Sequence, residues 1–215
     1  MPQFSYRTAY TAIKDRIELQ IDLETALRIA SRKGCPAGRI QNKELIQAFF
    51  DYDEVRRYSA SNPIDFDTEY FRASREVLVP IAPLSIIRER SQFVPIFACG
   101  WNSNPLNITQ RRLLMTIYED AFLSLTDYQK SPAEVLFFPK SEDANEGKLR
   151  RPEVWRRGDY GLLTRSELNR CVEIFVSARE LARKALLDEL EEMRKRDEQE
   201  EALPVADMGD LFEKK

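Results

Sequence analysis

The chain has 215 residues, is 43% hydrophobic, and carries a net charge of −3 from 36 acidic and 33 basic residues. It is therefore apolar enough to build a sizeable core, which excludes a disordered chain. It contains no histidine, which excludes the Ser-His-Asp and Cys-His catalytic arrangements and the histidine-based catalytic zinc sites.

The cysteine count and the apolar runs predict a cytoplasmic protein. The three cysteines, Cys35, Cys99 and Cys171, are odd in number and far apart, which is typical of reduced thiols inside a cell. No run approaches 18 consecutive apolar residues, and residues 1–16 lack the pattern of a secretory signal. We therefore expect neither a membrane span nor a membrane partner.

The N-terminal part of the chain shows apolar patterns that fit both a strand and a helix. Residues 17–23 alternate between apolar and polar, which favours a strand with residues 4–13 as its hairpin partner. The overlapping stretch 8–20 can equally be drawn as a helix. Asp22 is expected to open a helix that stops at Gly34, and Asn42 is expected to cap the next one.

The middle of the chain predicts a hairpin followed by a central helix. The two apolar runs 75–87 and 92–101 would pair across residues 88–92, and their prolines indicate edge or bulged strands, since proline has no N–H to donate. Asn107 or Thr109 would cap a helix over 108–128 whose wide apolar stripe suggests a central position. Residues 133–138 could be a strand or the end of a helical segment.

A long helix is predicted from Thr164 or Ser166 onward. One side of it is apolar and is expected to be buried, through Leu168, Val172, Phe175, Ala178, Ala182, Leu186 and Leu190. The stripe narrows after Leu187, so the helix should run out into solvent and stop at Pro204. Residues 188–215 hold 11 acidic and 5 basic residues, which leaves the body mildly basic and the end of the chain acidic.

These elements together predict an α+β fold: a helix-dominated single domain with a small antiparallel sheet and a long projecting C-terminal helix. We expect the globular domain to cover residues 1–190, followed by a charged helix end and mobile tail over 191–215. A split near residues 140–150 is the alternative.

A basic and aromatic segment is the best candidate for a nucleic-acid site. Arginine suits phosphate geometry and an aromatic ring can stack on a base. The alternative is that the tryptophan anchors the segment to the core and that Glu153 or Asp159 neutralises it. The predicted nucleic-acid-binding residues are Lys148, Arg150, Arg151, Trp155, Arg156 and Arg157.

The loop after the second apolar run is the candidate ligand recess. Trp101, Asn102 and Asn104 offer one aromatic face and several hydrogen-bonding groups, although a turn followed by a helix cap explains the same residues. Cys99 is expected to pack rather than react, because no histidine can activate it.

The end of the chain is the candidate protein-binding segment. Met208, Leu211 and Phe212 are apolar in an otherwise acidic tail, and they gain nothing unless they dock on something. Asp210, Leu211 and Phe212 resemble the end of the short peptides that bacterial replication proteins insert into the sliding clamp, without the usual leading Gln-Leu. Folding back on the body is the alternative.

Two functions remain open on these grounds. The first is a non-catalytic interaction or adaptor protein without a cofactor, an accessory subunit of a nucleic-acid-associated assembly that binds another protein through the C-terminal helix or tail. The alternative is a carboxylate- and metal-dependent enzyme acting on phosphates. It would need Asp65 and Asp67 to converge with Glu119 or Asp120 beside Arg111 or Arg112. No motif identifies a catalytic or metal-ligating residue.

Overall fold

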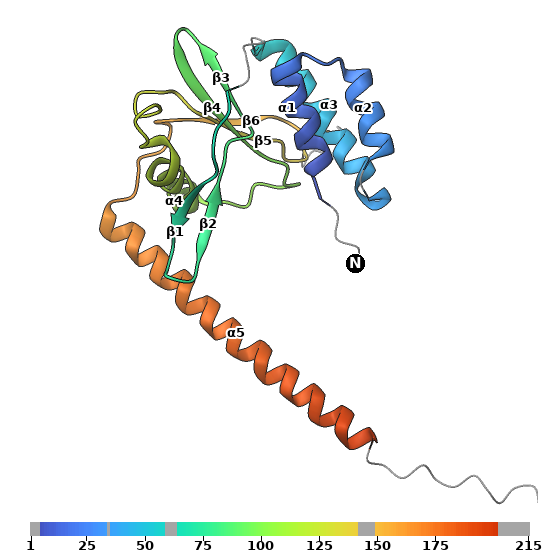
Figure 1. Ribbon diagram of the computed structural model, residues 1–215, viewed down its shortest axis with the longest axis vertical. Helices are drawn as coiled ribbons and strands as arrows, with labels where there is room; N and C mark the ends of the chain where they lie inside the picture. The colour runs from blue at the N-terminus through green and yellow to red at the C-terminus, as the bar shows by residue number, and fades with distance from the viewer. Residues whose placement is uncertain (1–4, 34, 59–63, 142–148, 202–215) are drawn as a thin grey trace, which may run out of the picture. The chain divides into compact units, whose positions relative to one another are not determined.

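The computed structural model describes residues 5–33, 35–58, 64–141 and 149–201 and confirms the mixed α+β fold with a long C-terminal helix (Figure 1). Its contacts divide the chain into two compact units, Met1–Leu168 and Asn169–Lys215. The predicted boundary at residue 190 is not tested by the structure and stays a prediction.

Three helices come first along the chain. They are α1 (Arg7–Leu19), α2 (Leu23–Arg32) and α3 (Arg39–Arg56), with a single 3₁₀ turn, η1 (Pro36–Gly38), before α3. The strand predicted over residues 17–23 is wrong, and the helical alternative is right. Ala9, Ala12, Ile13 and Ile17 are all fully buried, and their spacing of three and four residues is that of one helix face. The misleading alternation spans the end of one helix and the cap of the next.

The two predicted helix caps in this region have different outcomes. The Asp22 carboxylate accepts a hydrogen bond from the backbone N–H of Thr25 at 2.7 Å, so it caps α2 as expected. Asn42, in contrast, lies inside α3 and is buried. Its side chain accepts from the N–H of Ala9 at 2.9 Å and donates to the carbonyl of Gly38 at 2.7 Å. The predicted cap at Asn42 is wrong because α3 already begins at Arg39. The Asn42 oxygen instead binds the N–H of another helix, which local sequence does not show.

A four-stranded sheet forms the centre of the first unit. Its strands β3 (Ser85–Glu89), β4 (Gln92–Cys99), β5 (Glu134–Phe137) and β6 (Glu153–Arg156) lie in that order, and β1 (Glu69–Arg72) pairs separately with β2 (Leu78–Ile81). The predicted hairpin is confirmed in part as β3–β4, which turns through Arg90 and Ser91 with positive φ angles of 48° and 65°. The first apolar run, residues 75–87, is not one strand, because its earlier part forms β2 and pairs with β1. Neighbours in the larger sheet are antiparallel except β4 and β5, which run parallel because α4 lies between them in the chain.

Pro95 shows how β4 tolerates a proline although β4 has a neighbour on each side. It lies opposite Ile86 of β3, whereas the pairing of β4 with β5 begins only at Ile96. Proline has no N–H to donate to a ladder. Since β5 does not extend alongside Pro95, its missing donor leaves no acceptor of β5 unpaired.

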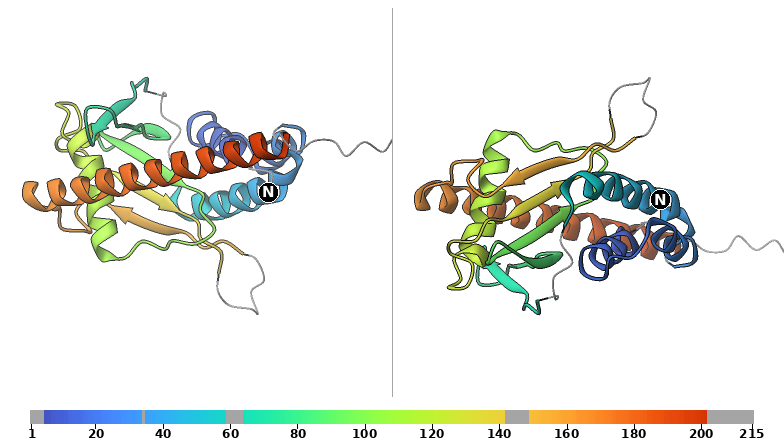
Figure 2. Two further views of the ribbon diagram at one scale, coloured as in Figure 1. Left: turned by 90° about the horizontal axis from the view of Figure 1, so that it is seen from below. Right: turned by 90° about the horizontal axis from the view of Figure 1, so that it is seen from above.

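Both faces of this sheet are covered by helices (Figure 2). Val94 and Ile96 of β4 belong to the core that α1, α2 and α3 form on one face. Phe97 points to the other face, where its ring stacks on Tyr118 at the end of α4 (Ile108–Tyr118) with 4.2 Å between centroids. The chain continues from α4 into a short π-helix, η2 (Glu119–Leu123). The β-strand alternative for residues 133–138 is confirmed as β5.

The start of α4 has the predicted cap. The Asn107 side chain accepts from the backbone N–H of Gln110 at 3.0 Å, and the Gln110 side chain accepts from the N–H of Asn107 at 2.9 Å. This reciprocal pair is a capping box, which satisfies two backbone donors that the first helical turn leaves free.

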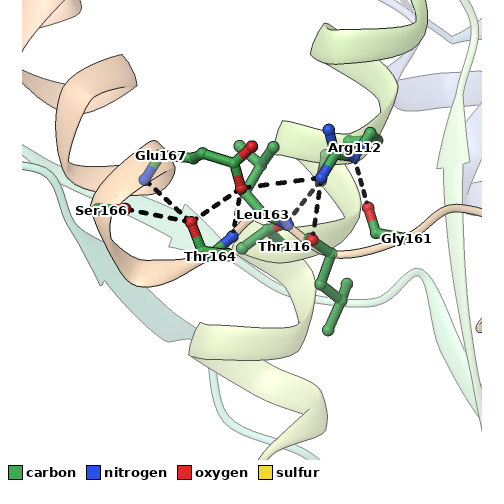
Figure 3. A network of polar contacts seen from close by, with 8 residues as sticks. Arg112, Thr116, Gly161, Leu163, Thr164, Ser166 and Glu167 are labelled. Carbon is green, nitrogen blue, oxygen red and sulfur yellow. Dashed lines mark hydrogen bonds and ion pairs between the residues drawn. The ribbon is translucent and has the colours of Figure 1, made fainter.

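Helix α5 (Arg165–Glu201) starts with a second capping box (Figure 3). The backbone N–H of Thr164 donates to the Glu167 carboxylate at 2.7 Å, and the N–H of Glu167 donates to the Thr164 hydroxyl at 3.3 Å. The Thr164 hydroxyl also donates to the Glu167 carboxylate, at 2.9 Å, and the bonds from the Thr164 N–H and hydroxyl lower the pKa of Glu167. Arg112 donates to the carbonyl of Gly161 at 2.8 Å, so the turn before α5 is tied to α4.

The predicted buried side of α5 is wrong from Phe175 onward, since Val172 in the second turn is still half-buried. Leu168 is buried, but Phe175 is 49% exposed, Leu186 is 56% exposed and Leu190 is 51% exposed. A 3.6-residue period shows that a helix has one apolar face, but it does not show that the same chain covers that face. Within its own unit, α5 therefore has an apolar face that no other described element covers.

Candidate functional site

Arg150 is a buried organising residue rather than a free surface cation. Its guanidinium donates to the carbonyl of Phe138 at 2.8 Å, to the carbonyl of Gly100 at 3.2 Å and to the Asn102 side chain at 2.8 Å. It also donates to the Tyr6 hydroxyl at 3.0 Å, and its side chain is 0% exposed. Because arginine offers five donors in a planar fork, one residue can hold several oxygens from different segments.

The predicted ligand recess and the predicted basic segment therefore meet at Arg150, which donates to the Asn102 side chain and to the carbonyl of Trp101. The Asn102 oxygen also accepts from the Tyr6 hydroxyl at 3.0 Å, and Asn104 donates to Glu153 at 3.0 Å. Trp101 is half-exposed. A recess of about 690 Å³ is lined by Asn102, Asn104 and Glu153, among others. Two of the three predicted recess residues thus use their side chains to hold the loop, which is what the turn-and-cap alternative requires.

Gly100 occupies a position where the backbone comes too close to its neighbours for a side chain. A Cβ built there would lie 2.7 Å from Cδ2 of Leu45 and 3.1 Å from Cγ of Tyr6. The N–H of Gly100 also donates to the Tyr10 hydroxyl at 2.9 Å. The glycine in this loop serves packing and not ligand approach.

We expect Gly100→Ala to lower the free energy of unfolding by about 1–3 kcal/mol, because overpacking forces side chains or backbone to shift. Gly161→Ala is the matched control, since a Cβ there meets nothing within 4 Å. Urea unfolding followed by tryptophan fluorescence measures both. Equal midpoints for the two variants would contradict the packing role of Gly100.

Cys99 lies half-buried at the end of β4. Burial raises the pKa of its thiol above the usual value, and the N–H of Trp101 opposes this only in part. A thiol is a nucleophile only as its thiolate. The environment of Cys99 therefore suits packing, as the sequence indicated.

The aromatic member of the basic segment is buried. Trp155 is 2% exposed, its ring lies 4.3 Å from that of Phe137 between centroids, and its indole N–H donates to Glu153 at 2.8 Å. A base cannot stack on a ring that the core already covers. The anchoring alternative matches this position of Trp155.

The arginines of the segment differ in their exposure to solvent. Arg157 pairs with Glu119 and donates to the carbonyls of Tyr128 and Ser131 at 2.7 and 2.8 Å. Arg151 and Arg156 are exposed, and Lys148 lies outside the described residues. Arg157 and Arg150 are thus already engaged within the chain.

The carboxylates of the enzymatic alternative have separate positions and partners. Asp65 and Asp67 are exposed, Glu119 binds Arg157, and Asp120 lies 3.3 Å from Arg165. Within residues 5–33, 35–58, 64–141 and 149–201, no group of three or more His, Cys, Asp or Glu residues has a geometry that could hold a metal ion.

The uncovered face of α5 is the main candidate site. We define the α5 face as Phe175, Ala178, Ala182, Leu186, Leu190 and Met193, all of which are exposed. In its unit, Asn169–Lys215, α5 is the one described element, so no other described element of that unit can cover the face. The predicted partner-binding residues Met208, Leu211 and Phe212 lie outside the described residues.

Across the described part of the chain, no helix is both long enough and apolar enough to span a membrane. Comparison with known proteins gives no relationship to argue from: no family model, no curated protein and no solved structure matches this chain.

Proposed function

We propose that this chain is a non-catalytic interaction protein of the cytoplasm, an adaptor or accessory subunit that binds another protein chain through the α5 face. One observation carries the proposal. The large apolar side chains of the first unit are mostly packed in its core, whereas Phe175, Leu186, Leu190 and Met193 of α5 are each about half-exposed. An apolar stripe on an amphipathic helix gains free energy only when something covers it.

Other features agree with this proposal. Cys35, Cys99 and Cys171 are all free thiols, as is usual in reducing compartments. Helix α5 is anchored at its start by the Thr164–Glu167 capping box, so the exposed face belongs to an element with a defined beginning. We do not extend the proposal to nucleic acid, because Trp155 is buried and Arg150 and Arg157 are already bound within the chain.

Site-specific photo-crosslinking tests the proposal in the full chain. A benzoylphenylalanine introduced at Leu190 should form a covalent adduct with a second polypeptide in cells of the protein's own source. The same probe at Val55, which is 85% exposed on α3, is the control and should give none. A Leu190 probe that yields no more adduct than the Val55 probe would remove the proposed function.

A further inference from the structure

Charges are distributed unequally along the segment of α5 that carries the α5 face. Residues 175–184 contain three basic residues and one acidic residue, whereas residues 185–193 contain four acidic residues and no basic one. Two such helices side by side attract each other when they run antiparallel, because each basic half then lies against an acidic half. In a parallel arrangement like charges face each other, which is destabilising.

The order of the side chains along the face agrees with the same arrangement. Consider two antiparallel copies of α5 related by a two-fold axis at residue 184. A residue of one copy then lies opposite the residue that is equally far from position 184, on its other side, in the second copy. Phe175 then faces Met193, Ala178 faces Leu190, and Ala182 faces Leu186. Two of these three pairs place a small side chain opposite a large one, which lets the two surfaces interdigitate. The contact would extend over about 27 Å at 1.5 Å per residue.

Two charged residues lie inside the apolar stripe, and they too are matched. Arg179 follows Phe175 by four positions and precedes Leu186 by seven, and Glu189 precedes Met193 by four. Both therefore lie on the α5 face. In the antiparallel arrangement Arg179 faces Glu189 of the second copy, and this happens twice because of the symmetry. In a parallel arrangement each of these residues would face the same residue of the second copy, and so a charge of the same sign.

We propose that the partner of the α5 face is a second copy of this chain, bound as an antiparallel α5–α5 pair centred at residue 184. This rests on the proposed function and names its partner. Arg179 holds Glu180 at 2.9 Å within one helix. That exposed contact is weak enough to give way to a pair with Glu189 of the second copy.

Sedimentation equilibrium of the full purified chain tests the self-association. The natural chain should be a dimer. Leu186→Glu should raise the dimer dissociation constant by about 100-fold or more, because it places a charge inside the buried contact. Leu187→Glu is the matched control, since Leu187 is the adjacent residue, is exposed to a similar extent at 52%, and points away from the face. Circular dichroism checks that both variants keep their helices.

Charge exchange tests the direction of the pair. Arg179→Glu and Glu189→Arg alone should each weaken the dimer, because each places like charges together. Combining the two substitutions in one chain should restore it, because opposite charges then face each other again across an antiparallel pair. In a parallel pair the double variant would keep both like-charge contacts. A double variant as weak as the single ones would overturn the antiparallel arrangement.

The outcomes separate this inference from the function on which it rests. A natural chain that remains monomeric at all concentrations, or a dimer that Leu186→Glu leaves intact, overturns the self-association. If the Leu190 probe then still forms an adduct whose second chain is a different protein, the proposed function stands without self-pairing. If the probe forms none, both fail. An adduct between two copies of the chain, together with the Leu186→Glu effect, supports both.

Discussion

Arg150→Met is expected to lower the free energy of unfolding by about 3–5 kcal/mol. The substitution keeps an unbranched side chain of similar length but removes all five donors. The carbonyls of Gly100 and Phe138 then lose the Arg150 donors, and the Asn102 oxygen keeps the Tyr6 hydroxyl as a donor. Leaving buried acceptors unsatisfied costs about 1–3 kcal/mol each before relaxation. Urea unfolding of the full chain, followed by the fluorescence of buried Trp155, measures the change.

Two further variants define what Arg150 contributes. Arg151→Met is the matched control, because Arg151 is the adjacent residue and is exposed. Its expected effect is within about 0.5 kcal/mol. Arg150→Lys keeps the charge but cannot reproduce a planar fork, so it should be nearly as unstable as the methionine variant. A stable Arg150→Lys variant would show that the positive charge of Arg150, rather than its several hydrogen bonds, stabilises this part of the fold.

Local signals in the sequence predicted the elements that depend on local contacts. The caps at Asp22 and Asn107 were identified because their partners lie three residues along the chain. The β3–β4 hairpin was identified for a similar reason, since its two apolar runs are adjacent. The α+β class follows from these elements once they are placed in order.

Features that depend on distant partners were not predictable in this way. Arg150 looked like a surface cation because its acceptors, such as Gly100 and Tyr6, lie 50 and 144 positions away. Trp155 looked available for stacking until β5 placed Phe137 beside it. The α5 face was predicted to be buried because periodicity shows an apolar side but not its cover. The same face then became the best candidate for binding.

The ionic network around Glu134 was not found from sequence, because its partners Tyr58 and Arg56 lie 76 and 78 positions away. The structure buries Glu134 at the start of β5, where it accepts from the Tyr58 hydroxyl at 2.6 Å and from Arg56 at 3.0 Å. Arg56 also donates to both oxygens of Glu89, at 3.0 and 2.9 Å. Burial, followed by the nearby Glu134 carboxylate, raises the pKa of Tyr58 above its ordinary value of 10.0.

Glu134→Gln should therefore lower the free energy of unfolding by about 3 kcal/mol, because breaking a buried pair leaves Arg56 partly uncompensated. Glu89→Gln is the matched control. It removes the other carboxylate from the same arginine at a more exposed position, 26% against 7% for the side chain, and should cost about 1 kcal/mol or less. If the control costs as much as Glu134→Gln, burial of the pair is not what makes it stabilising.

The pH dependence of the unmodified chain follows from the same network. A tyrosine whose pKa is raised by folding binds its proton more tightly in the folded state. Its contribution to stability is thus fully present below pH 10.0, the ordinary pKa, and is lost as the pH rises toward the folded value. Tyr118 has its pKa raised by burial in the same direction. The tyrosinate absorbance of Tyr58 and Tyr118 should therefore appear only as the chain unfolds, above pH 10.0. Tyrosinate signal from the buried rings while the chain stays folded would contradict their inaccessibility to water.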